Sequence, residues 1–399
     1  MNISEDDDNK KVEEIQEEFE HLNDLLDWNR KFLIFGGIWP LENTKFRAAI
    51  FTAYMTFHLF TEYSGVVEVV GNFEAMVLGI IESSMQSMVL SKLFVFRHSK
   101  NLRVLISAMK EDFQENNYND LNEKKIYLKY NYYSKLYFKL SVPYVLTIAA
   151  LYYARPLLTS LILGTFGVND SLILPFQTKL FFPIDNTQTY FYVYIWYCPM
   201  VYLLACHNAF ICILITIILH ICGQLAVVEY RIKNLKYDHE KDHNQMIFKT
   251  LVQRHQRSIW MAKTFDTSFN VVLLIDLIGS TVLIGLLSYS IVTESETLET
   301  SFVYIYICAI IATLFLLFGY CYVGECLVEN STRVHEVYYE CEWHKMSLKF
   351  QKSLSFCLME TEKPLTMTAG KIFVFSLSGY AYVIKSAMGY VSMLRNVAM

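Results

Sequence analysis

The chain has 399 residues, of which 54% are hydrophobic and only 18% are charged, with a formal net charge of −5 and a mean hydropathy of +0.28. A soluble protein of this length would divide into two or three domains with far more polar surface. The composition excludes that class, and we expect no nucleic-acid partner. Stretches of 18 or more residues with few charges recur along the chain, and such stretches are typical of transmembrane helices.

Residues 1–46 open with MNISEDDDNKKVEEIQEEFE, which has no apolar core and is therefore not a signal peptide. Apolar side chains then recur at helical spacing, which predicts an amphipathic helix on the surface of the protein or of the membrane. These positions are Val12, Ile15, Phe19, Leu22 and Leu26.

Seven membrane spans follow, so the predicted fold class is an all-α protein embedded in the lipid bilayer. The second span is the least apolar because it carries Glu74, Glu82 and Lys92. The predicted spans are Arg47–Val67, Asn72–Phe96, Leu136–Leu158, Thr189–His220, Phe269–Val292, Phe302–Val328 and Ala369–Val397.

Lysine and arginine are distributed unequally between the spans. The N-terminal region and the connections after spans two, four and six hold many, whereas the connection after span three holds only Lys179 and those after spans one and five hold none. The positive-inside rule predicts a cytosolic N-terminus, and seven spans then place the C-terminus outside. No cysteine falls in a predicted outside loop, so no extracellular disulfide is expected, and the sequon at Asn169 is a predicted glycosylation site.

Three other classes of protein are disfavoured. G-protein-coupled receptors have the opposite orientation, and their DRY-like and NPxxY motifs are absent from the sequence. The stretch His239 to His243 (HEKDH) matches a zinc-binding pattern, but its polar flanks favour a solvated loop. Transporters more often contain internal repeats, and we find none. We therefore expect no metal, no cofactor and no enzyme activity.

The last segment, PLTMTAGKIFVFSLSGYAYVIKSAMGYVSMLRNV, resembles the C-terminal segment of insect odorant receptors. Three shorter motifs resemble others of that family: GIWP before the first span, FPID before the fourth, and YECEW with Tyr339 and Trp343. Met367 and Gly389 depart slightly from the family pattern. Gustatory receptors of the same superfamily usually end in a T-Y-x-x-x-x-Q-F motif, which is absent.

The resemblance implies a subunit of a ligand-gated, non-selective cation channel in the plasma membrane of olfactory sensory neurons, at the sensory dendrite. It implies four subunits around a pore, assembled with an odorant co-receptor and opened by a small volatile ligand. The implied regions are 1–46 (cytosolic N-terminus), 47–222 (spans one to four, with the ligand pocket), 223–268 (cytosolic anchor), 269–328 (spans five and six), 329–368 (cytosolic anchor) and 369–399 (pore helix and extracellular C-terminus).

For the pore, the resemblance implies a hydrophobic gate at Met393 and Val397 and a polar ring at Asn396. Small and polar residues, including Gly389, share that face of the last helix. We expect this helix to start near Pro364, with its first turns in the cytosol.

The odorant pocket is implied in the outer halves of spans two, three, four and six. The ionisable residues Glu82, Asp276 and Lys385 are further candidates because charges inside a membrane are usually functional. The predicted odorant contacts are Phe73, Met76, Val77, Ile80, Thr147, Ala150, Leu151, Ala154, Tyr197, Met200, Val201, Tyr304, Ile307 and Ile310.

Overall fold

The computed structural model describes residues 12–42, 44–162, 174–184, 186–235, 241–294 and 303–398, and this part of the chain is almost entirely helical. The elements in chain order are η1 (His21–Asn23), α2 (Asp24–Phe35), α3 (Lys45–Glu68), α4 (Phe73–His98), α5 (Lys100–Asp112), η2 (Glu115–Asn117), α6 (Leu121–Ile162), α7 (Thr187–Trp196), α8 (Cys198–Lys233), α9 (Lys241–Glu294), α10 (Val303–Glu340), η4 (Trp343–Lys345), α11 (Leu348–Thr361), β1 (Thr368–Ala369), β2 (Phe373–Val374) and α12 (Leu377–Ala398).

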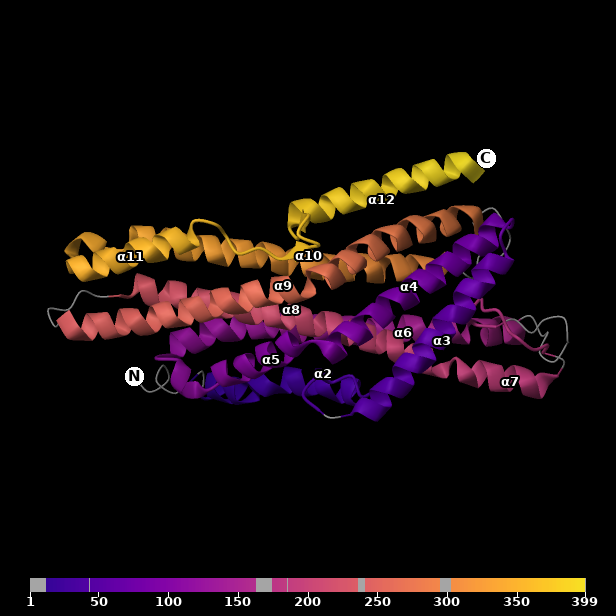
Figure 1. Ribbon diagram of the computed structural model, residues 1–399, viewed down its shortest axis with the longest axis horizontal. Helices are drawn as coiled ribbons and strands as arrows, with labels where there is room; N and C mark the ends of the chain where they lie inside the picture. The colour runs from indigo at the N-terminus through magenta and orange to yellow at the C-terminus, as the bar shows by residue number, and fades with distance from the viewer. Residues whose placement is uncertain are drawn as a thin grey trace, which may run out of the picture.

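The three longest helices of the described residues are much longer than a membrane is thick. Helices α6, α9 and α10 have 42, 54 and 38 residues. At ~1.5 Å per residue they reach roughly 57–81 Å, against ~30 Å of hydrocarbon. The bundle is accordingly elongated, with its long helices running along the long axis and α11 lying beside α10 at one end (Figure 1). The helical anchor regions predicted from sequence are largely continuations of the spanning helices.

Five of the described helical segments are long and apolar enough to cross a membrane. They correspond to the predicted spans two to six. Helices α3 and α12, with 24 and 22 residues, occupy the predicted first and seventh spans and also exceed the ~20 residues that a crossing needs. The five segments are Phe73–His98, Leu121–Leu158, Thr187–Lys233, Met246–Val292 and Val303–Glu340.

Helix α8 is the centre of the bundle. Its most apolar stretch is 94% buried, and α8 packs against α2, α4, α6, α9 and α10. A helix that is apolar on every side needs neighbours on every side. The predicted fourth span is one apolar helical segment, Thr187–Lys233, which is interrupted at a single residue, Tyr197, between α7 and α8. Pro199, in the first turn of α8, has no N–H to continue the hydrogen bonds of α7.

The start of the last span also differs from the prediction. Instead of a helix from Pro364, the chain forms a β-hairpin in which Thr368 pairs with Val374 and Ala369 with Phe373. Gly370 and Lys371 make its turn with φ of 58° and 62°, a conformation that glycine adopts without strain. Helix α12 therefore begins only after the hairpin, and its 22 residues give about 33 Å, close to the thickness of the hydrocarbon.

Helix α12 lies along one edge of the bundle, where it packs on α9 and α10 (Figure 1). Its buried side chains include Val383 and Ala387. Large apolar residues such as Tyr382, Met388 and Met393 are exposed. One face of α12 thus packs on its own chain, and the other is open.

Candidate functional site

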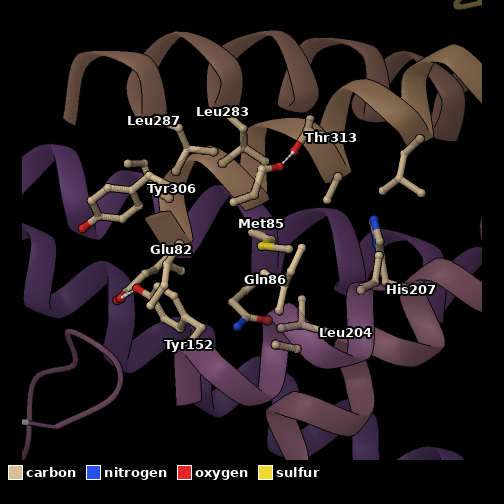
Figure 2. A pocket seen from close by; sticks show the side chains of 18 of the residues that line it. Glu82, Met85, Gln86, Tyr152, Leu204, His207, Leu283, Leu287, Tyr306 and Thr313 are labelled. Atoms are coloured by element: carbon tan, nitrogen blue, oxygen red, sulfur yellow. Dashed lines mark hydrogen bonds between the residues drawn. The ribbon is translucent and has the colours of Figure 1, made fainter. Parts of the chain in front are cut away.

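A cavity of ≈ 100 Å³ lies within the bundle, between α4, α6, α8, α9 and α10 (Figure 2). Its wall is mostly apolar. The apolar lining consists of Ile81, Met85, Val145, Ile148, Ala149, Phe176, Leu204, Leu283, Leu287, Ile305, Ala309, Ala312 and Leu316. The polar or amphipathic lining consists of Glu82, Gln86, Tyr152, His207, Tyr306 and Thr313.

Small side chains at helical spacing create the space. Ala309 and Ala312 on α10 face the cavity with Leu316, one turn further on, and Ala149 faces it from α6. Alanine leaves room where leucine or phenylalanine would fill the interior at normal packing density. Helix α4 contributes Ile81 and Met85, which lie four residues apart and so on one face.

The segment 174–184 closes one end of the cavity with Phe176. This ring is buried and lies with its centroid 5.9 Å from Tyr152 and 5.6 Å from Tyr197. Glu82 holds the segment in place, because its carboxylate accepts hydrogen bonds from the Tyr152 hydroxyl and from the Gln177 N–H, the latter at 2.7 Å. The intramembrane Glu82 therefore fastens the closing segment to α4 and α6.

The other end of the cavity meets a buried ion pair. Nζ of Lys92 lies 2.8 Å from Oδ2 of Asp276 and 3.3 Å from Nε2 of His207, which lines the cavity. The Tyr320 hydroxyl donates to the same Asp276 oxygen at 2.9 Å. All four side chains are buried, and they come from α4, α8, α9 and α10. A buried charge pair is stable only with such additional hydrogen bonds.

The ion pair continues toward the start of α12. The Tyr320 ring packs on Phe375, the residue that follows the hairpin, with centroids 5.6 Å apart. Phe375 is fully buried and its carbonyl approaches Gly324 so closely that a Cβ there would lie 2.3 Å from the oxygen. Only glycine fits at this contact. A continuous set of packed side chains thus runs from the cavity to the base of α12.

The hairpin itself is held by α9. Oδ1 of Asp266 accepts hydrogen bonds from the backbone N–H and the hydroxyl of Thr368 at 2.8 and 2.6 Å, and Oδ2 pairs with Lys371. Gly370 N–H donates to the Asn270 carbonyl at 2.8 Å. The TAGK stretch therefore fixes the base of α12 on α9.

The sequence matches a known protein family over most of its length. The family model described as 7tm odorant receptor matches residues 77–388, more than three quarters of the chain. The chain belongs to the odorant receptor family. This family consists of receptors and not of enzymes, so the chain is not an enzyme.

The receptor is 26% identical to Odorant receptor 13a of Drosophila melanogaster over 256 residues, which cover 57% of this chain and 59% of that protein. It is also 26% identical to the odorant receptor coreceptor of Anopheles gambiae over 145 residues, or 36% and 30% of the two chains. The receptor thus matches less than two thirds of the length of these curated relatives.

The fold of the receptor is that of a solved relative. The insect olfactory receptor OR5 from Machilis hrabei, solved in complex with eugenol, has a TM-score of 0.78 at 14% identity and covers 94% of this chain and 100% of its own. This likeness, with five apolar helices long enough to span a membrane, confirms the predicted fold class. The odorant receptor is an all-α, multi-pass membrane protein.

None of the fourteen predicted odorant contacts lines the cavity, although α4, α6, α8 and α10 contribute both sets. Tyr304 is 70% exposed, whereas Tyr197 and Met200 are buried in the core. Tyr197 lines a different hollow of ≈ 310 Å³, which Phe57 and Trp196 also line. Odorant contact by the fourteen residues stays a prediction.

Several other predicted sites lie outside what the structure describes. The side chains of Asn396 and Val397 fall there, as do Asn169 and His239. Met393 is described and is 66% exposed on α12. The pore, glycosylation and zinc-loop interpretations therefore remain predictions.

Sequence reasoning missed the polar residues Gln86 and His207 and the contribution of α9, from which Leu283 and Leu287 line the cavity. A signal was available for α10, because alanines at positions 309 and 312 lie within an otherwise bulky apolar helix. Two small residues three apart mark a face on which space is left.

Proposed function

We propose that this receptor binds a small volatile in the cavity and opens a cation-conducting pore lined by α12. The observation that supports it most is the cavity itself, which is apolar, buried between five helices and closed by Phe176. Sites for small apolar ligands have this character. The fold relative solved with eugenol supports the same class of ligand.

The size of the cavity favours a small ligand. Engineered apolar cavities of about 150 Å³ bind benzene. A cavity of ≈ 100 Å³ admits a ring of that size only if the wall yields. Met85 is the wall residue that yields most readily, because its unbranched side chain adapts to irregular space.

We further propose that the ligand acts on α12 through the contacts described above. A ligand that moves His207 shifts a partner of Lys92, and the ion pair with Asp276 connects to Tyr320 and Phe375. Packed networks of this kind have two discrete arrangements rather than a continuum. This route from His207 to Phe375 is tested by odorant-evoked currents in variants of Lys92 and Asp276.

The proposed assembly is a channel of four subunits that include an odorant co-receptor, located in the plasma membrane of olfactory neurons. Sequence similarity to the coreceptor of Anopheles gambiae supports a shared assembly. The proposed orientation, with a cytosolic N-terminus, rests on the lysine and arginine distribution. Antibody access to terminal epitope tags on intact cells checks it.

A pair of neighbouring alanines tests the cavity. Ala149→Leu adds three carbon atoms to the cavity wall, whereas Ala150→Leu adds them to the exposed face of the same helix. We expect Ala149→Leu to raise the odorant concentration for half-maximal current about tenfold or more, because overfilling costs roughly 1–3 kcal/mol. The measurement is odorant-evoked current in cells that co-express the co-receptor, normalised to surface expression.

Ala150→Leu is the control and also tests a residue that the sequence predicted as an odorant contact. We expect its dose-response curve to overlie that of the unmodified receptor. A shift with Ala150→Leu but not with Ala149→Leu would place the ligand outside this cavity. Absence of current with every odorant, with and without the co-receptor, would contradict the proposed function.

The pore prediction is tested at the end of α12. Asn396→Asp adds a negative charge near the proposed outer mouth, so relative calcium permeability is expected to rise. The reversal potential in calcium-rich medium measures it, and the shift is modest because only some subunits carry the change. Leu394→Asp, at a different angle around the helix, is the control. If Leu394→Asp alters permeability and Asn396→Asp does not, the proposed face of α12 is wrong.

A further inference from the structure

Most polar groups in the cavity wall already have a partner. Glu82 accepts from Tyr152 and Gln177, and the Thr313 hydroxyl donates to the Ala309 carbonyl of its own helix at 2.9 Å. His207 lies against Lys92, and Tyr306 also has an interaction partner. These groups are engaged before any ligand arrives.

Gln86 is the exception. It lies one helical turn after Glu82 on α4, between the polar groups at the two ends of the cavity (Figure 2). The residue is only 2% exposed, and its Oε1 has no hydrogen-bond partner among the described residues. Buried polar atoms are nearly always paired, so an unpaired one in the wall of a cavity points to a partner that enters the cavity.

We propose that Gln86 is the residue that hydrogen-bonds the ligand, and that the ligand class is a small apolar molecule with one hydroxyl group. The amide of Gln86 presents an acceptor or, when turned over, a donor. A hydroxyl group matches either orientation, because it both donates and accepts. The other polar groups of the wall are already engaged within the protein, and the remaining lining side chains are apolar. This inference rests on the proposed function and adds the chemistry that the ligand must carry.

The test pairs alcohols with hydrocarbons in which a methyl group replaces the hydroxyl: benzyl alcohol with ethylbenzene, and 1-butanol with pentane. For each pair, the ratio of half-maximal concentrations, hydrocarbon over alcohol, is measured in the receptor and in Gln86→Met, each co-expressed with the co-receptor. We expect the ratio to fall by about 5- to 150-fold in Gln86→Met. In the unmodified receptor the hydrocarbon leaves the buried Gln86 amide unpaired, and methionine has no amide to leave unpaired. Comparing ratios cancels differences in solubility and expression.

Thr313→Val is the matched control, because it removes a cavity-wall hydroxyl that already has a partner. Its ratio should stay within about twofold of the unmodified value. Gln86→Leu provides a second apolar variant of different shape. Equal ratios in Gln86→Met, Gln86→Leu and the receptor overturn the inference, and so does a similar fall in Thr313→Val. Equal ratios are also the result expected if a permanently bound water molecule hydrogen-bonds Gln86.

A second readout needs no ligand. Replacing an unpaired buried amide with methionine should leave the melting temperature of the purified receptor unchanged or raise it. A fall of several degrees would mean that Gln86 has a partner within the protein, and it overturns the inference. Currents that respond to the compounds with an unchanged ratio contradict the inference alone, whereas no response to any compound removes the proposed function as well.

Discussion

Asp276→Asn is expected to destabilise the folded receptor by about 3–5 kcal/mol, because it leaves the ammonium group of Lys92 charged and unpaired inside the bundle. Both side chains are buried, and their charged atoms lie 2.8 Å apart. Asparagine keeps the shape of the residue and an oxygen that accepts from the Tyr320 hydroxyl. The loss of stability therefore reports the effect of removing the charge alone. Surface expression and the melting temperature in detergent measure the effect.

The double variant Lys92→Met with Asp276→Asn is the decisive comparison. Removing both charges is expected to recover most of the lost stability, since neutral replacement of a buried ion pair is often tolerated. Glu360→Gln is the matched control, because its pair with Lys263 is of similar length, 2.7 Å against 2.8 Å, but both side chains are more than half exposed. That variant should change stability by at most about 1 kcal/mol. A double variant no more stable than Asp276→Asn would contradict the assignment.

The same variants separate folding from gating. If the ion pair transmits movement from His207 to Tyr320, the double variant reaches the surface but conducts less at saturating odorant. Unchanged currents in a well-expressed double variant would mean that the pair only stabilises the bundle. The coupling route would then have to avoid Asp276.

The apolar helices could be predicted from the sequence because length and hydropathy are properties of a single segment. The break at Tyr197 and the hairpin before α12 could not, since both depend on one or two local residues. Pro199 interrupts a continuous apolar run, and Gly370 allows a turn where the pattern TAGKIFVFS continues smoothly into a helix. A hydropathy profile averages over a window of many residues, so it does not detect the effect of a single proline or glycine.

The residues that line the cavity were harder to predict from the sequence than the helices that contribute them. Ile80 and Ala150 were predicted as contacts, whereas their chain neighbours Ile81 and Ala149 line the wall. Adjacent residues on a helix point about 100° apart, so choosing the face matters as much as choosing the helix. On helices with apolar residues on all sides, hydropathy gives no facial signal. Tyr197 and Met200 also lie earlier on their segment than Leu204, one to two turns away from the cavity.

The sequence identified the charged residues inside the spans as unusual, but it did not predict their interaction partners. Glu82 and Asp276 stood out because membranes exclude charge. Their partners come from helices far away in sequence: Tyr152 for Glu82, and Lys92 for Asp276. Such pairs depend on tertiary contacts, which a single sequence does not specify.

The attachment of the base of α12 to α9 depends on Asp266. Asp266→Ala removes all three interactions that hold the hairpin through this carboxylate, two of them to Thr368 at 2.8 and 2.6 Å. Hydrogen bonds to a charged group contribute roughly 1.5–3 kcal/mol each, so the hairpin should detach while the bundle stays folded. We expect odorant-evoked current to fall at least tenfold, because the base of α12 no longer follows α9. Faster amide hydrogen exchange in residues 366–376 should accompany this loss.

Lys371→Met is the matched control, since it removes only the ion pair to Asp266, and the Lys371 side chain is 55% exposed. Solvent screens such a pair, so the expected effect on current is small. An activating odorant should still raise the melting temperature of purified Asp266→Ala, because Asp266 does not line the cavity. If Lys371→Met abolishes current as fully as Asp266→Ala, the exposed ion pair is the anchor. If Asp266→Ala conducts normally despite fast exchange in the hairpin, α12 is moved from another point, and Phe375 against Gly324 is the contact to test next.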